Sequence, residues 1–208
     1  MSLYTPSHFA AQDTADAITL MRDYPFATLI TTHMGEPHIT HLPLLWDSQD
    51  EHGVIYGHMA CANPHWRQLS GGHTTAIFHG PHAYISPSWY ANPDREVPTW
   101  NYATVHVHGV PQLIEARDEK LALIDRSVAL FEQGNTPPWT RKVEGARLDG
   151  MLDAIVAFRM PIRRIEAKFK MNQNRTAADR KQVIARLREI AHPDLIAMSD
   201  WMESHERN

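Results

Sequence analysis

The segment "ISPSWYANPDREVPTWNY" runs from Ile85 to Tyr102 and separates two stretches that have the character of β-strands. Its centre is rich in Pro, Asn and Asp, which is typical of a surface loop. Large aromatic residues flank that centre, namely Trp89, Tyr90 and Trp100. Aromatic side chains in such a loop either pack on a core or a partner subunit, or line a site for a flat ligand. The rest of the sequence has to distinguish between these two interpretations.

The stretches around this loop have the composition of strands joined by tight turns. Thr, Ile, Val and aromatic residues dominate them, and Gly or Pro separates them. We expect breaks at Gly80-Pro81 and at Pro161. The expected strands cover residues 26–34, 38–47, 53–60, 74–80, 82–86, 100–115, 152–160 and 162–171.

Helices are fewer and gather near the end of the chain. Asp13 is predicted to cap a helix that stops before Pro25, and Asn63 to cap a short helix at 62–72. Further helices are expected at 119–134, 177–191 and 194–205. Because regular βαβ alternation is missing, the pattern favours an α+β fold: a closed antiparallel barrel with helices packed on it.

Composition describes an ordinary globular protein of one domain or one domain with an appendage. The chain has 208 residues, of which 43% are hydrophobic and 21% charged. Its single cysteine, Cys61, excludes an intramolecular disulfide and suits a reducing cytoplasm. Neither a signal-peptide pattern nor an apolar run of membrane-spanning length is present. We therefore expect a cytoplasmic protein that does not insert into a membrane.

Basic residues concentrate near the C-terminus, although the net charge is −4. Ten Lys or Arg residues lie between Arg159 and Arg188, against only Glu166 and Asp179, a local charge of +8. This basic run is either a solvated face or an anion site. The anion would be a phosphate-bearing cofactor or nucleic acid.

Two further segments contain groups that bind anions. In "GHMACANPHW" a strand leads into a helix at Asn63-Pro64, where free backbone N–H groups can hold a phosphate. In "KFKMNQNR" the side chains of Lys170, Gln173 and Asn174 could satisfy carbonyl and anionic oxygens. Either segment can also be explained as an ordinary turn before a helix.

Fourteen histidines raise the question of a metal site. His106 and His108 alternate on an expected strand, but no third and fourth ligand follow at zinc-site spacing. We expect no bound metal, and we interpret Cys61 as a small buried apolar residue. The nucleophile pattern G-x-S-x-G is absent, so no catalytic residue is identified.

Taken in order, six segments resemble one family. They are "LYTPSHF", "HLPLLW", "GHMACANPHW", "GPHAYISPSWY", "VPTWNY" and "KMNQNR". Together they are similar to the PaiB-like FMN-binding proteins, often described as negative transcriptional regulators. The resemblance runs from residue 3 to about residue 180. "KMNQNR" departs from the family's K-L-S-Q-N pattern at Met171 and Asn172, which removes a serine hydroxyl.

The resemblance implies an FMN-binding split β-barrel, related in fold to pyridoxine phosphate oxidase, that forms a homodimer with flavin sites at the subunit interface. The aromatic loop could then pack on a partner and line a flavin pocket. We expect the barrel domain to cover 1–176, and a C-terminal helical segment, 177–208, to pack on the barrel or on the partner subunit. The implied cofactor-binding residues are His41, Leu42, Pro43, His58, Ala60, Asn63, Trp66, Ser88, Trp89, Trp100, Asn101, Lys170, Gln173 and Asn174.

These residues have different implied roles. The strand at His41 to Pro43 would run beside the isoalloxazine ring, and His58 with the Ala60–Asn63 turn would approach the phosphate. Lys170 would stabilise negative charge on the flavin. The implied function is negative transcriptional regulation, with possible DNA contact through the basic run. Alternatives are an FMN-dependent oxidoreductase or flavin reductase acting on a small molecule, a haem-binding split-barrel protein, or a dimer that has lost its cofactor.

Overall fold

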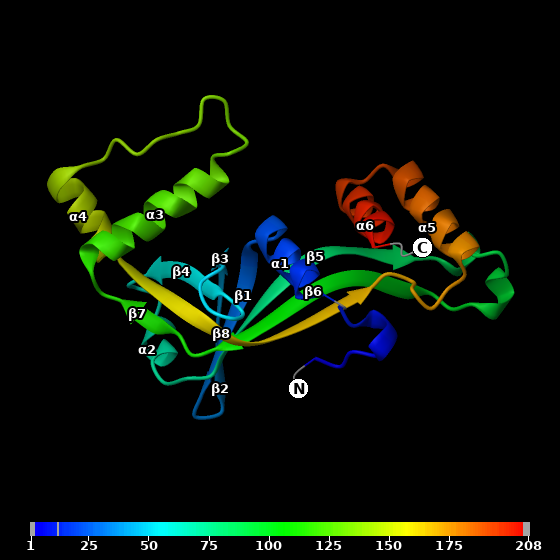
Figure 1. Ribbon diagram of the computed structural model, residues 1–208, viewed down its shortest axis with the longest axis horizontal. Coiled ribbons are helices and arrows are strands. Elements are labelled where there is room, and N and C mark those ends of the chain that lie inside the picture. The colour runs from blue at the N-terminus through cyan, green and yellow to red at the C-terminus, as the bar shows by residue number, and fades with distance from the viewer. Residues whose placement is uncertain (1–2, 12, 206–208) are drawn as a thin grey trace. The chain divides into compact units, whose positions relative to one another are not determined.

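The computed structural model describes residues 3–11 and 13–205 (Figure 1). The chain divides into two compact units. The first contains 1–24, 78–106 and 166–208, and the second contains 25–77 and 107–165. The division passes through three long strands, which are β5 (Thr74–Ile85), β6 (Thr99–Gly109) and β8 (Ile155–Lys170). Residues 177–208 fall in the first unit, and their expected separation as a segment of its own stays a prediction.

The strands form one sheet in the order β2-β1-β5-β6-β8-β4-β3, and β7 pairs with β8. The remaining strands are β1 (Phe26–His33), β2 (Glu36–Pro43), β3 (Leu45–Asp47), β4 (Val54–Ala60) and β7 (Gln112–Ile114). This antiparallel sheet with helices confirms the α+β split-barrel class. The expectation of a closed barrel is wrong, because the path is open between β2 and β3. β2 begins with the exposed Glu36 and Pro37, residues that suit an unpaired edge.

The second unit is built around the β1–β2 hairpin and the β4–β8 pair. The hairpin pairs Phe26 with Pro43 and His33 with Glu36. Its turn is Met34-Gly35, with φ of 50° and 85°, as a two-residue turn of this hand requires. β4 pairs with β8 from Val54–Pro161 to Ala60–Ile155.

Three helices complete the second unit. They are α2 (Trp66–Leu69), α3 (Arg117–Phe131) and α4 (Gly145–Asp153). The helix expected at 62–72 is therefore a single turn, and α4 was not predicted. Arg117 Nε on α3 donates to Asp149 on α4 at 2.7 Å. Among residues 3–11 and 13–205, no helix is long and apolar enough to cross a bilayer.

The first unit packs three helices on one face of its strands. These are α1 (Thr14–Asp23), α5 (Ala177–Ile190) and α6 (Pro193–Ser204), and short 3-10 turns η1 (Ser7–Phe9), η2 (Pro87–Trp89) and η3 (Pro93–Arg95) accompany them. Asp13 caps α1 as predicted, accepting from the Ala15 N–H at 2.9 Å. The Phe169 ring of β8 packs edge-on against Trp201 of α6, with centroids 5.6 Å apart. Figure 1 shows α5 and α6 as a helical pair beside β5 and β6.

Two predicted strand breaks are wrong. β5 runs through Gly80-Pro81 without interruption. Gly80 is needed there for close packing, since a Cβ atom at this position would lie 2.8 Å from Leu20 Cδ1 and 3.2 Å from Ala103 Cβ. β8 also runs through Pro161, which sits at the last rung of the β4 ladder. A missing N–H is tolerated where pairing ends.

Candidate functional site

The predicted cofactor residues fall into two groups, one in each compact unit. His41, Leu42, Pro43, His58, Ala60, Asn63 and Trp66 belong to the second unit, and Ser88, Trp89, Trp100, Asn101, Lys170, Gln173 and Asn174 belong to the first. Each group is described by itself below.

Thr40 organises the group in the second unit. Asn63 Nδ2 donates to Thr40 Oγ1 at 3.0 Å, and His65 Nδ1 lies 2.8 Å from the same oxygen. The His65 N–H donates in turn to Asn63 Oδ1 at 3.0 Å. These bonds tie the end of β2 to the turn after β4. Sequence reasoning missed Thr40, which directly precedes "HLPLLW", and His65, which lies within "GHMACANPHW".

The turn after β4 uses most of its own backbone donors. The N–H groups of Cys61, Asn63, Arg67 and Gln68 donate to the carbonyls of Ala154, Ala60, Pro64 and His65 at 2.9 to 3.1 Å. The indole N–H of Trp66 donates to the Cys61 carbonyl at 3.0 Å. The predicted phosphate cradle of free N–H groups therefore lacks most of the donors it needs. Asn63 and Trp66 hold the turn together, and their contact with a cofactor stays a prediction.

Pro43 and His58 meet at a cavity of about 350 Å³. Its other walls are mainly apolar side chains of α3 and the loop after it, with Ile124, Val128, Phe131 and Trp139 among them. Burial lowers the pKa of His58, so the ring favours its neutral form. Beside this cavity the hairpin buries Leu42, while His41 is exposed and its Nδ1 lies 3.1 Å from Thr28 Oγ1.

Burial also lowers the pKa of His65, and the neighbouring His38, whose ring centroid is 6.0 Å away, lowers it further. The His65 side chain is buried, and its Nε2 has no hydrogen-bond partner among the described residues. An imidazolium would be costly in this position.

We expect the free energy of unfolding to fall as the pH drops below about 6.5, the usual histidine value. The unfolded chain then binds protons that the folded His58 and His65 resist, so acid favours unfolding. Urea denaturation at a series of pH values measures how steeply the free energy of unfolding depends on pH. The dependence should be weaker in His65→Gln. A dependence identical to that of the unsubstituted chain would contradict the role given to His65.

The group in the first unit forms an exposed aromatic face. His82 and Tyr84 on β5 and Trp100 and Tyr102 on β6 alternate with buried residues, so all four side chains point to one side. The Trp100 ring lies 6.2 Å from His82 and 6.0 Å from Tyr84, and 53% of Trp100 is exposed. The helices cover the opposite side, where the fully buried Asn101 donates to Met202 Sδ at 3.4 Å.

Two lysines of β8 border this aromatic face. Lys168 and Lys170 are two residues apart, so their side chains leave the strand on the same side. Lys168 Nζ donates to the Tyr4 carbonyl at 3.0 Å and lies 5.3 Å from the Tyr102 ring centroid. Lys170 Nζ donates to Thr99 Oγ1. Thr99 and Lys168 are positioning residues that sequence reasoning missed.

The positive charges near Lys170 affect the pKa of its side chain. Burial lowers the pKa of its ammonium, and Lys168 and Arg175 lower it further. Arg175 is paired with Glu96 at 2.5 Å and lies over the Tyr90 ring. With that carboxylate engaged by Arg175, the two lysines can accommodate an added anion.

The other predicted residues of this unit hold local structure. Gln173 is occupied at both ends, since its amide N–H donates to the Phe169 carbonyl and its Oε1 accepts from the Met171 N–H at 2.7 Å. Ser88 Oγ lies 2.8 Å from Ser86 Oγ. Trp89 is half-buried in η2, and Asn174 is exposed after β8. Lys170 and Trp100 are therefore the predicted residues best placed to meet a ligand.

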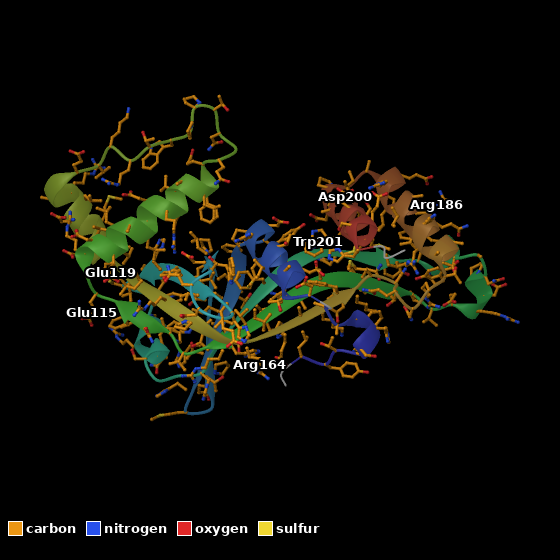
Figure 2. All side chains as sticks on the ribbon, in the orientation of Figure 1. Glu115, Glu119, Arg164, Arg186, Asp200 and Trp201 are labelled. Atoms are coloured by element: carbon orange, nitrogen blue, oxygen red, sulfur yellow. The ribbon has the colours of Figure 1, made fainter. Side chains whose placement is uncertain are left out.

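The basic run extends over both compact units and over several elements. Arg164 and Arg186, labelled in Figure 2, come from different elements, β8 and α5. Arg186 pairs with Glu189 at 2.5 Å. Arg188 pairs with Asp200 at 2.9 Å and with Glu203 at 2.7 Å. Arg186 and Arg188 are thus paired with acidic side chains of the same chain.

Comparison with known proteins agrees with this architecture. Residues 3–164 match the family model described as "Putative FMN-binding domain". The chain is 34% identical over 204 residues to the protease synthase and sporulation protein PAI 2 of Bacillus subtilis, with 97% of each chain covered.

Two solved structures share the fold. An FAD- and haem-binding protein of Mycobacterium smegmatis is 16% identical with a TM-score of 0.62, over 82% of this chain and 78% of that one. The flavocytochrome Anf3 of Azotobacter vinelandii is 19% identical with a TM-score of 0.58, over 81% of this chain and 69% of that one.

Proposed function

This chain belongs to the FMN-binding domain family, and from that membership we propose that it is a homodimeric flavoprotein that acts in negative transcriptional regulation. We further propose that FMN lies at the interface between two copies. The observation that carries the proposal is the buried Lys168 and the half-buried Lys170 beside an exposed aromatic face. Retention of FMN by the purified protein tests it.

The first unit fits a flat, phosphorylated group. Exposed Trp100 and Tyr84 offer apolar ring faces, and Lys168 and Lys170 offer positive charge beside them. FMN combines a planar ring system with a phosphate, and binding it would offset the repulsion between the two ammonium groups. An ordinary solvated polar face would not combine exposed aromatic rings with two neighbouring ammonium groups.

A homodimer also explains why large aromatic side chains remain exposed. Exposed rings next to a positive border are typical of the centre of an interface, where Trp and Tyr are enriched. Within the first unit, Trp100 and Lys170 would contribute to the flavin site. Bound FMN supplies redox chemistry. The chain's own task is to hold it, with Lys170 stabilising negative charge on it.

The regulatory part of the proposal does not depend on direct DNA contact through the basic run. The Bacillus subtilis relative is named for protease synthesis and sporulation, which is compatible with a role in gene control. Because Arg186 and Arg188 are engaged by acidic side chains, an indirect route is better supported.

We therefore expect no tight, salt-dependent binding to duplex DNA by the FMN-loaded protein. Fluorescence anisotropy of a labelled duplex from the region upstream of its own gene, at low and at moderate salt, measures this. If the protein contacted six or more phosphates, counterion release would lower its affinity for DNA by about 10³-fold or more between low and moderate salt. Tight binding with such a slope would overturn the indirect route.

A second candidate function is FMN-dependent reduction or oxidation of a small molecule. The cavity of about 350 Å³ beside Pro43 and His58 favours it, because it could hold a small apolar substrate. Turnover of NAD(P)H by the FMN-loaded protein would support this candidate, and no turnover with either donor would argue against it.

A further inference from the structure

A second cavity lies in the first unit, on the face that the helices cover. It has a volume of about 320 Å³, within the range of small-ligand sites. Phe169 of β8 and Met171, which directly follows the strand, line it, whereas Lys168 and Lys170 leave the strand on the other side. The cavity is therefore separate from the aromatic face proposed for FMN.

His205 lines this cavity, and its Nε2 atom has no hydrogen-bond partner among the described residues. Its Nδ1 lies 2.8 Å from the Trp201 carbonyl oxygen, which can only accept, and 3.0 Å from Ser204 Oγ, whose own proton is donated to the same carbonyl, so in the neutral ring the proton is on Nδ1. Nε2 then carries a lone pair. It is buried and has no hydrogen-bond partner among the described residues. An unsatisfied buried acceptor is a cost that a ligand can remove.

A carboxylate oxygen, which is also an acceptor, lies near that lone pair. Asp16 Oδ1 on α1 lies 3.7 Å from His205 Nε2, too far for a direct hydrogen bond. A group with at least two N–H donors could bind Asp16 Oδ1 and His205 Nε2 at the same time. An ammonium group suits this position because it has three N–H donors and a positive charge opposite the carboxylate.

Aromatic and thioether side chains form part of the wall beside this pair. The His205 ring stacks on Trp201, with centroids 5.0 Å apart and planes within 11°, and lies 5.5 Å from the Phe169 ring. Phe169, Met171 and Met202 offer carbon and sulfur surface to a short alkyl chain. Arg180, which also lines the cavity, donates to the Arg175 carbonyl at 2.8 Å.

We propose that this cavity binds a small organic amine. Its ammonium group sits at Asp16 and His205, and its alkyl part lies against Phe169, Met171 and Met202. The site is independent of the proposed flavin function, because it uses the opposite face of β8.

Calorimetric titration of the full-length chain with n-butylammonium chloride tests this proposal. Sodium n-butyrate and n-butanol serve as probes of similar length, with a negative charge and without charge. The expected result is saturable binding of butylammonium at one site per chain and none of the other two. Failure of butylammonium to bind would overturn the proposal, and so would equal binding of n-butanol, which would show an apolar site only.

Two variants locate the binding. Asp16→Asn removes the charge, and His205→Phe keeps a ring for stacking on Trp201 but removes Nε2. Each should weaken butylammonium binding by about tenfold or more, the range for losing a charge-assisted bond. Asp94→Asn, at an exposed position of η3, is the matched control and should bind like the unsubstituted chain.

Unchanged binding by Asp16→Asn would contradict the site. If His205→Phe does not fold, Asp16→Asn and the selectivity of the unsubstituted chain still decide. FMN retention should be the same in Asp16→Asn as in the unsubstituted chain, so a failure here is distinguishable from a failure of the flavin proposal.

Discussion

Replacing Lys170 with methionine is expected to weaken FMN binding by about 10- to 150-fold, the equivalent of losing a hydrogen bond to a charged group. Methionine keeps the length and apolar stem of the side chain. It removes the ammonium that is held by Thr99 and crowded by Lys168. The apoprotein should be no less stable, because the substitution relieves repulsion between like charges.

Quenching of flavin fluorescence during titration of the apoprotein measures this dissociation constant. Lys181→Met is the matched control, since Lys181 is exposed on α5 and has no proposed role. It should bind FMN as the unsubstituted chain does. Equal losses in both variants would point to a general charge effect, and an unchanged constant for Lys170→Met would exclude Lys170 from the site.

Replacing Trp100 with glutamate is expected to separate the homodimer and to abolish FMN retention. Trp100 is 53% exposed in the single chain and stands between His82 and Tyr84 on the aromatic face. A tryptophan at the centre of an interface commonly contributes 2 kcal/mol or more, about 30-fold in the dimer dissociation constant. A buried carboxylate adds a desolvation cost to that loss.

Sedimentation velocity over a range of protein concentrations measures the change. Met34→Glu is a suitable control because Met34 is 91% exposed at the tip of the β1–β2 hairpin. That variant should sediment like the unsubstituted protein. A Trp100→Glu protein that remains dimeric and keeps its flavin would place the interface elsewhere.

The sequence patterns predicted the strand content and the helix ends that side chains mark. Asp13 was identified as a cap because its carboxylate binds a nearby N–H, a local interaction. The breaks at Gly80 and Pro161 were predicted wrongly for the opposite reason. Glycine is required at position 80 because Leu20 and Ala103, which are distant in sequence, leave no room for a Cβ atom. Pro161 is tolerated within β8 because its pairing with β4 ends there.

The candidate site shows the same division between local and distant interactions. Lys170 and Trp100 could be selected from motifs, because charge and aromatic character belong to the residues themselves. Asn101 could not be placed from its motif, since its burial against Met202 depends on α6, about a hundred residues later. Thr40 and His65 were missed because their importance comes from one hydrogen-bonded cluster with Asn63.

The most direct test of FMN binding is the absorbance spectrum of the purified protein after addition of FMN and desalting. Mass spectrometry of the released cofactor and the sedimentation of the coloured species complete the measurement. We predict flavin bands that travel with a dimer and one FMN per chain. A colourless protein after desalting, or flavin carried by a monomer, would contradict an FMN site at the interface of two copies.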